Sequence, residues 1–262
     1  MDELTPTAGR DVKSAFRALE MLELLTREGQ ALTFAECHRA LAYPKASLHG
    51  LLRTMTGAGW VTFDPATKKY GLGVRVWEAG IAYTRMFPLE TLARPIMERV
   101  RDATTETVQL AVLDGGEALY VGKVDGEHIL RLDSSVGQRL TAHATGVGKV
   151  LLSELSKDEF EAWLKGNKLV RFTPNTITEP RKLREELEQV RGRGFATDRE
   201  ERTLGAACVA VAVRNHLGKC VAAMSVSAPA VRFGAGQRKM ALAHLLDAAS
   251  ALSTALGHSA AR

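Results

Sequence analysis

Two adjacent helix signals within residues 33–72 constrain the fold of this chain more than any other feature. Thr33 and Glu36 have the spacing of a capping box, which predicts a short helix that runs to about Leu41. Pro44 suits the first turn of a second helix, KASLHGLLRTMTGAG, which the glycines near its end would stop. Two short helices joined by a tight connection predict a helix-turn-helix.

The residues that follow predict a β-hairpin. The stretches at Trp60 to Phe63 and at Lys69 to Leu72 are prone to form strands, and the turn-rich DPAT lies between them. Helix, turn, helix and hairpin in this order are typical of a winged helix-turn-helix, in which the second helix enters the major groove of DNA. Upstream, apolar residues at helical spacing predict a first helix that ends near Gly29. We expect a DNA-binding domain over residues 1–73.

The second helix has one apolar side and one polar side. Leu48, Leu51, Leu52 and Met55 recur at the spacing of a core-facing stripe. The candidate DNA contacts, on the opposite side and on the hairpin, are Lys45, Ala46, Ser47, His49, Arg53, Lys68 and Lys69. Donor side chains and a helix N-terminus suit phosphates and base edges, and five basic residues oppose two acidic ones between residues 33 and 72. The alternative is an ordinary helical hairpin with solvated charges.

Gly50 lies on the same polar side of this helix. An exposed glycine inside a helix costs up to about 1 kcal/mol relative to alanine. Either the backbone approaches DNA closely at this position or the glycine is a tolerated weak residue, and the sequence leaves both interpretations open.

Composition supports an intracellular protein with a polyanionic partner. The 262 residues suffice for two cores, and the formal charge of +5 mildly favours a nucleic acid. Cys37, Cys208 and Cys220 are scattered without metal-ligand spacing, so we expect a reduced cytoplasmic protein with neither metal nor cofactor. No signal peptide and no membrane-spanning apolar stretch is expected.

The remainder of the chain predicts a linker helix over residues 74–87 and a second domain over residues 88–262. A helix from Pro88 to about Thr104 precedes three candidate strands, VQLAVLDG, ALYVGKVD and HILRLD. Helices are expected around residues 146–165 and 180–193. Two strands, ACVAVAVRN and CVAAMSVSAP, and a helix over about 235–256 complete the domain. The whole chain is therefore predicted to be α+β, with a mixed α/β second domain of the size of a ligand sensor.

The chain resembles the IclR family of bacterial transcriptional regulators over nearly its whole length. The resemblance rests on SAFRALEMLELL, TFAECHRALAYPKASLHGLLRTMTGAGWV, YGLG, TVQLAVLDGGEALYVGKVD, HATGVGKVLLS, TITEPRKLREELEQVRGRGFATDREE and ACVAVAVRNHLGKCVAAMSVSAP, in the family's order and spacing. It implies homodimers or dimers of dimers, double-stranded operators that are pseudo-palindromic, and a GAF-like effector domain that binds small organic acids or related metabolites.

The resemblance also implies an effector site at Gly146, Val147, Asp198, Cys208, Ser225 and Ser227. The residues themselves agree in part. Gly146 and Gly148 lie at an expected helix N-terminus, which attracts a carboxylate, and Ser225 and Ser227 point to one face of a strand. The alternatives are a buried hydrophobic role for Cys208, backbone hydrogen bonds for the serines, and a surface or turn carboxylate at Asp198.

Three positions depart from the family. Arginine is common in the family where this chain has Gly50, so one expected DNA contact is missing. Alanine is frequent at the position of Val147 and glycine at that of Ala228, and both changes are expected to narrow or reshape the ligand pocket.

Two other functions compete with a ligand-responsive regulator. A cysteine-dependent hydrolase would use Cys208 as nucleophile, a histidine (His143, His216 or His244) as base, and Asp198 as orienting group. No nucleophile elbow, phosphate loop or HExxH motif supports it, so we expect no enzymatic activity. The other alternative is a DNA-binding protein whose second domain only forms oligomers.

Overall fold

The structure is a computed structural model that describes residues 12–86, 89–129 and 134–258. The chain divides into two compact units, residues 1–87 and 88–262. Among the described residues, no helix is both long enough and apolar enough to span a bilayer.

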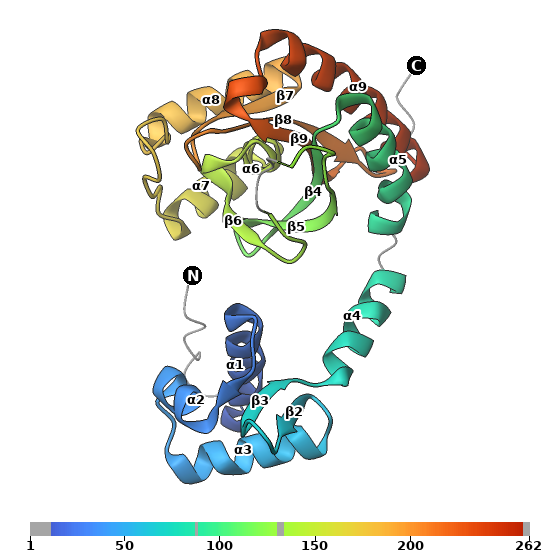
Figure 1. The fold of residues 1–262 in the computed structure, drawn as a ribbon. Helices are drawn as coiled ribbons and strands as arrows, with labels where there is room; N and C mark the ends of the chain where they lie inside the picture. Colours follow the sequence, from blue (N-terminus) through green and yellow to red (C-terminus); the bar gives the residue numbers. More distant parts are fainter. Residues whose placement is uncertain (1–11, 87–88, 130–133, 259–262) are drawn as a thin grey trace. The chain divides into compact units, whose positions relative to one another are not determined.

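The first unit contains the predicted helix-turn-helix and wing (Figure 1). Its elements are α1 (Lys13–Glu28), β1 (Leu32–Thr33), α2 (Phe34–Leu41), α3 (Lys45–Gly57), β2 (Val61–Asp64), β3 (Lys69–Leu72) and α4 (Val74–Met86). The strands form an antiparallel sheet in the order β1-β3-β2. The helices and the hairpin match the sequence prediction, whereas the two-residue β1 was not predicted because so short a strand has no periodicity to detect.

The start and the end of the helices in this unit follow local chemistry. The Thr33 backbone N–H donates to Glu36 Oε2 over 2.7 Å, and the Glu36 N–H donates to Thr33 Oγ1 over 3.3 Å, which confirms the predicted capping box. Gly29 ends α1 in the left-handed region at φ 62°. The core of the unit joins α1, α2 and α3 to β2, and its buried members include Met21, Leu24, Cys37, Leu48, Leu52 and Val61.

The second unit contains one antiparallel sheet and five α-helices among its described residues. Its helices are α5 (Leu89–Thr104), α6 (Gly146–Ser153), α7 (Lys157–Gly166), α8 (Pro180–Arg193) and α9 (Ala235–Ala255), with short 3-10 turns at Ala142–Ala144 and Ala230–Arg232. Its strands are β4 (Thr107–Asp114), β5 (Glu117–Val124), β6 (Arg139–Thr141), β7 (Phe195–Arg199), β8 (Ala206–Arg214) and β9 (Cys220–Pro229). The strand order is β6-β5-β4-β9-β8-β7.

The sequence predictions for this sheet were right for the long apolar strands and incomplete elsewhere. β4, β5, β8 and β9 lie where they were expected. The predicted strand HILRLD falls largely on residues 130–133, which lie outside the described residues, and His128 and Ile129 are not in a strand. β6 and β7 were not predicted, because β6 has only three residues and β7 ends on the polar pair Asp198 and Arg199.

The two faces of the sheet carry different residues. Alternate side chains such as Leu110, Val209 and Met224 pack in one core with α5 and α9. Residues one position along, such as Ala111, Ala210 and Ala223, pack on the other side with α6 and α8 (Figure 1). This period of two is what an antiparallel strand imposes, and it places α6 directly over the face that carries the predicted effector residues.

Two glycines let α6 lie against its surroundings. A Cβ at Gly148 would lie 2.2 Å from the backbone oxygen of Ala142, and one at Gly146 would lie 2.5 Å from Cys208 Sγ. Neither distance is compatible with a side chain unless the chain moves. The residue types at the start of α6 therefore reflect close packing onto β8 and onto the turn that precedes the helix.

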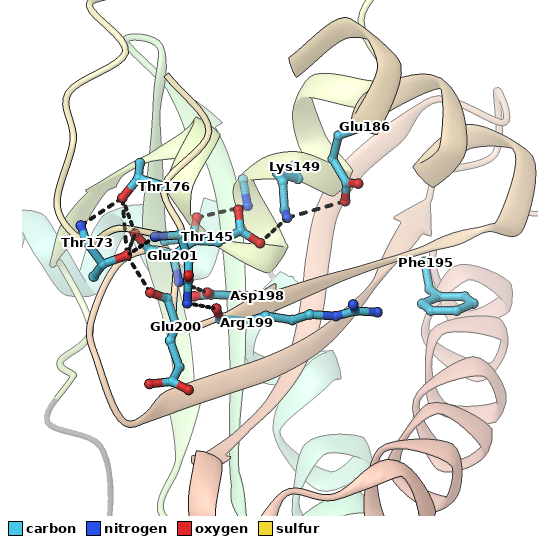
Figure 2. A network of polar contacts seen from close by, with 12 residues as sticks. Thr145, Lys149, Thr173, Thr176, Glu186, Phe195, Asp198, Arg199, Glu200 and Glu201 are labelled. Carbon is cyan, nitrogen blue, oxygen red and sulfur yellow. Dashed lines mark hydrogen bonds and ion pairs between the residues drawn. The ribbon is translucent and has the colours of Figure 1, made fainter. Parts of the chain in front are cut away.

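A buried ion network attaches α6 to two other segments. Lys149 is 1% exposed, and its Nζ lies 2.6 Å from Glu201 Oε1 and 3.3 Å from Glu186 Oε1 (Figure 2). Arg193 Nη2 lies 2.9 Å from the same Glu186 oxygen. Because a buried ammonium is costly unless it is paired, α6, α8 and the turn after β7 depend on one another.

Hydroxyl groups hold the turn after β7 from the other side. Thr173 Oγ1 donates to the backbone oxygen of Glu200 over 2.7 Å, and Thr176 Oγ1 donates to that of Glu201 over 2.6 Å (Figure 2). Asp198 Oδ1 accepts from the Glu201 N–H over 2.7 Å. Glu200 itself adopts φ 62°. These bonds stabilise an otherwise unfavourable left-handed backbone and fix the position of Glu201.

Replacing Lys149 tests this network. Lys149→Met should lower the free energy of unfolding of the second unit by about 3 to 5 kcal/mol, because it leaves the Glu201 carboxylate buried without its cation. Urea denaturation followed by circular dichroism measures the change. Arg181→Met is the matched control: it removes a pair with Glu185 that is 89% and 54% exposed, and it should cost less than about 1 kcal/mol. Equal stabilities for the two variants would contradict the role given to Lys149.

Candidate nucleic-acid interface and ligand site

Helix α3 presents a polar side because its apolar side is fixed in the core. Leu48 and Leu52 are fully buried and Met55 is 5% exposed, as the helical spacing predicts. The five candidate DNA contacts on α3, Lys45, Ala46, Ser47, His49 and Arg53, are all exposed. The helix begins at Lys45, directly after Pro44, so its first N–H groups adjoin two of these side chains. This arrangement can donate to phosphates and base edges.

The His49 ring is supported by the preceding helix. It lies 4.8 Å, centroid to centroid, from the ring of Phe34 at the start of α2, and His38 stacks on the same phenylalanine at 6.3 Å. Sequence reasoning missed Phe34, because it follows the N-cap Thr33 and belongs to no apolar stripe. The contact orients His49 on the exposed side of α3.

The hairpin turn holds its two lysines differently. Asp64 accepts from the Thr67 hydroxyl over 2.6 Å and from the Ala66 N–H over 2.9 Å, and these bonds lower the pKa of the Asp64 carboxyl. Lys68 is exposed at φ 54°. Lys69 is half-buried, and its charge adds to the hydrogen bonds from Thr33 that lower the pKa of Glu36. Lys68 is therefore the freer of the two to meet a phosphate.

Strand register brings three of the predicted effector residues into one row. Asp198 on β7 is paired with Cys208 on β8, which is paired with Ser227 on β9. Directly paired residues of an antiparallel sheet point to the same face, and this is the face that α6 covers. Ser225 lies two residues before Ser227 on β9, so its side chain points to the same face, as the sequence predicts. Gly146 and Val147 come from the start of α6 above this row.

Both serines converge on a residue that sequence reasoning missed. Ser227 Oγ donates to Gln109 Oε1 over 2.8 Å, and Ser225 Oγ donates to the same oxygen over 3.3 Å. Gln109 Nε2 donates to Ser134 Oγ over 2.7 Å. Gln109 lies on β4 and is 4% exposed. In the sequence, the one sign of its role is an amide side chain inside the apolar run TVQLAVLD. The serine hydroxyls thus bind a side chain, not the neighbouring backbone.

The two substitutions expected to reshape the pocket differ in outcome. Val147 is 1% exposed and packs against Ala111 and Tyr120 on the face that α6 covers. Ala228 packs in the core that α5 and α9 form on the other face. The expectation for Ala228 was wrong, because residues 227 and 228 necessarily point to opposite faces of β9.

Cys208 lies beneath the start of α6. The Gly146 N–H is directed at its sulfur, and the Gly148 N–H donates to Thr145 Oγ1 over 3.2 Å. The first three N–H groups of α6 belong to Gly146, Val147 and Gly148. Within the described residues, only the Val147 N–H has no protein acceptor. An anion at this helix end would therefore meet the Val147 N–H, whereas the sequence suggested Gly146 and Gly148.

The same environment makes Cys208 a poor nucleophile. Burial raises the pKa of its thiol to about 12, so the thiolate is scarce near neutral pH. His143 Nε2 lies 3.0 Å from the backbone oxygen of Val170, and burial lowers the pKa of this imidazole. His216 is exposed after β8, and His244 is exposed on α9, across the sheet. The described residues thus contain no Cys–His pair of the kind that the hydrolase alternative requires.

Asp198 combines burial with a structural hydrogen bond. It is 7% exposed, and burial raises the pKa of its carboxyl to about 7 despite the bond from the Glu201 N–H. Tyr120 lies near enough for the charges of Asp198 and Cys208 to add to burial in raising the pKa of its phenol. Tyr120 is a further lining residue that sequence reasoning missed, because its strand shows only the ordinary alternation of inward and outward side chains.

A cavity of about 260 Å³, lined by described residues, lies away from this site. It opens beside α9 near Thr104, His128 and Gln237, and none of the six predicted effector residues lines it. Its buried carboxylate, Glu106, accepts from Arg232 over 2.5 and 2.8 Å. In the part of the chain that the structure describes, no group of three or more His, Cys, Asp or Glu side chains could hold a metal ion.

The raised pKa of Asp198 predicts a pH dependence. From about pH 4, the ordinary range of an aspartate, to about pH 7, the folded chain binds a proton at Asp198 that the unfolded chain has released. Stability therefore falls as pH rises through this window. Asp198→Asn keeps an acceptor for the Glu201 N–H and should reduce that fall, measured as unfolding free energy at pH 5 and pH 7. Identical pH slopes in variant and parent would contradict the assignment.

Comparison with known proteins covers both units. The model of the bacterial transcriptional regulator IclR C-terminal domain matches residues 81–254, and that of the IclR helix-turn-helix domain matches residues 14–65. The HTH-type transcriptional regulator XynR of Escherichia coli (strain K12) is 33% identical over 249 residues, which cover 95% of this chain and 99% of XynR. The regulator BhcR of Paracoccus denitrificans is 31% identical over 242 residues, 92% of this chain and 86% of BhcR.

Solved structures agree with these matches. The IclR of Thermotoga maritima has a TM-score of 0.77 at 29% identity and covers 95% of this chain and 100% of its own. An IclR homologue from Microbacterium hydrocarbonoxydans, complexed with 4-hydroxybenzoate, has a TM-score of 0.83 at 27% identity and covers 93% of this chain and 99% of its own. With its N-terminal helix-turn-helix and its C-terminal effector-binding domain, the chain belongs to the IclR family of bacterial transcriptional regulators.

Proposed function

We propose that this regulator binds operator DNA through α3 and the wing, and that a small organic acid bound beneath α6 changes its operator affinity. The observation that carries the ligand half of the proposal is the row of Asp198, Cys208 and Ser227 under the start of α6. Polar side chains gathered beneath a helix N-terminus suit a small anionic molecule better than they suit a core.

The DNA half rests on the exposed side of α3. Lys45, Ser47, His49 and Arg53 supply donors, and Lys68 supplies a charge at the wing. Phosphate contacts from the lysines would set register, and Arg53, near the middle of the exposed side, is placed to read a base. Ala46 would meet the DNA by apolar contact, and Lys69 would contribute less because its charge also faces Glu36.

The ligand half draws on a neighbour as well as on local chemistry. The homologue from Microbacterium hydrocarbonoxydans is complexed with 4-hydroxybenzoate, an aromatic acid. In this chain a carboxylate would meet the Val147 N–H and the dipole of α6, while Ser225, Ser227 and Tyr120 would contact the rest of the molecule. A protonated Asp198 would limit charge repulsion with such an acid.

Burial of the site provides the link to regulation. The non-glycine members of the predicted set are at most 8% exposed, so a ligand that reaches them must change the packing around them. A ligand shifts an equilibrium between two conformations only by its differential affinity for them. A typical coupling of about 1 to 3 kcal/mol would change operator affinity roughly 5- to 150-fold.

We also propose that the chain works as a homodimer or a dimer of dimers. Val74 and Trp77 on α4 are 64% and 66% exposed, and large apolar side chains at this level of exposure suit a contact between copies. Two copies would present two α3 helices, which matches a pseudo-palindromic operator. A purely oligomerising second domain remains the competing function, and it predicts that no metabolite changes operator affinity.

Arg53→Ala tests the DNA half. The variant should bind about tenfold or more weakly, a loss of ~1 to 3 kcal/mol, to a duplex selected from a random-sequence library by the parent protein. Fluorescence anisotropy measures the affinity. Arg181→Ala, an equal change on the exposed surface of α8, should leave it unchanged. If Arg53→Ala binds as tightly as Arg181→Ala, α3 does not contact DNA through Arg53.

The serine pair tests the ligand half. A thermal-shift screen of aromatic and keto acids, including 4-hydroxybenzoate, first finds an acid that stabilises the parent. Ser225→Ala combined with Ser227→Ala should weaken that acid at least tenfold while operator affinity without ligand stays within twofold, because the serines lie in the second unit. Ser250→Ala, on α9, is the matched control. An undiminished ligand response in the double variant would place the pocket elsewhere.

A further inference from the structure

Arg202 places a positive charge next to the predicted effector residues. It follows Glu201 in the turn after β7, whose backbone is held by the hydroxyls of Thr173 and Thr176 (Figure 2). Its Nε atom is buried without an acceptor, and among the described residues its guanidinium forms no hydrogen bond and no ion pair. Because buried donors are almost always paired, this one points to an acceptor that the chain itself does not supply.

Other arginines of the second unit show the pairing that Arg202 lacks. Arg184 and Arg232 each donate from Nε and from Nη2 to the two oxygens of one glutamate, over 2.5 to 2.8 Å. This two-bond arrangement is the one that a planar guanidinium and a carboxylate prefer. Arg202 instead lies over an aromatic ring, with its Cζ 4.0 Å from the ring centroid of Phe172. Such a contact stabilises the charge but supplies no oxygen acceptor.

The charge of Arg202 acts on two residues beside the start of α6. Burial raises the pKa of the Tyr120 phenol, and the charge of Arg202 opposes that rise. Burial lowers the pKa of His143, and the charge of Arg202 lowers it further. His143 has its ring centroid 6.1 Å from that of Phe172, and it precedes Thr145, the N-cap of α6, by two residues. The guanidinium therefore lies near both Tyr120 and the turn that leads into α6.

The site thus offers an anion a second position besides the Val147 N–H. Val147 packs against Tyr120, the same phenol that is close to the charge of Arg202. The full charge of Arg202 and the partial charge of a helix N-terminus, about half an elementary charge, exceed what one carboxylate neutralises. Lys149 adds nothing to this sum, because it is paired with Glu201.

We infer that the effector carries two acidic groups, and that the Arg202 guanidinium pairs with one of them while the other lies at the start of α6. This inference rests on the proposed function, because it concerns the same site. A second carboxylate would accept from the buried Nε–H and balance the charge, whereas a hydroxyl group would leave the charge unbalanced. Arg202 is then a specificity-determining residue that selects dicarboxylates over monocarboxylates.

Matched acids and a matched arginine test this inference. The dicarboxylates are succinate, glutarate, isophthalate and terephthalate, and their counterparts with one carboxylate fewer are propionate, butyrate and benzoate. 4-Hydroxybenzoate has a hydroxyl group where terephthalate has its second carboxylate. Arg202→Gln removes the charge and Arg202→Lys keeps it without the fork of donors, while the control Arg199→Gln removes an exposed charge three residues earlier on β7. Isothermal titration calorimetry on the full-length proteins measures each affinity.

We expect the parent to bind at least one dicarboxylate tenfold or more tightly than its monocarboxylate counterpart. Arg202→Gln should weaken that dicarboxylate at least tenfold and its counterpart less than threefold, because only the dicarboxylate loses a charged pair. Arg202→Lys should retain part of the preference, because a lysine keeps the charge but donates from a single point. Arg199→Gln should bind every acid like the parent.

Two results would overturn the inference. One is a parent that binds no dicarboxylate more tightly than its monocarboxylate counterpart. The other is an Arg202→Gln variant that weakens both members of a pair equally, which shows that the arginine only supports the turn. Failure of the proposed function is distinct from both, because then no acid of either class would bind the parent or change its operator affinity.

Discussion

The ion pair between Lys149 and Glu201 is the interaction on which the second unit depends most. Lys149 is among the largest fully buried side chains, and it comes from the helix whose first turn covers Cys208. Glu201 comes from the turn that Asp198 caps. A charge buried so completely must find its partner, so α6 and the turn after β7 cannot settle independently. The ion pair therefore holds the start of α6 over the row of polar residues that strand register assembles.

Periodicity predicted most of this architecture and little of its polar detail. The helices of the first unit were predicted from capping and stop signals together with apolar spacing, the wing from β-prone stretches around a turn, and the four long strands from their runs of apolar residues. β7 was missed because its inward positions include Asp198, which reads as a turn residue in sequence. Gln109 was missed because its partners Ser225 and Ser227 are more than a hundred residues away and only strand register brings them together. The family resemblance named the effector residues, but register explains why they are neighbours.

The predicted functional residues of the two units differ in solvent exposure. The candidate DNA contacts stand in solvent on a helix held by Leu48 and Leu52, so they can bind a large partner without rearrangement. The predicted effector residues are enclosed, so any molecule that reaches them changes the packing around α6. A large exposed surface suits strong, salt-dependent attraction to DNA. An enclosed polar site suits a conformational switch, because a ligand cannot bind there without a change of conformation.

The convergence of two serine hydroxyls on Gln109 has a mechanical consequence. β4 follows α5 with only the left-handed Thr105 and Glu106 between them, and α5 is the first described element after the boundary of the units. Upstream of Gln109, the chain therefore passes through the start of β4 and a two-residue corner into α5. A ligand that competes with Gln109 for either serine would weaken the side-chain link between β9 and β4. A change at the serines would thus reach β4 through Gln109 and, through the corner at Thr105, the helix α5.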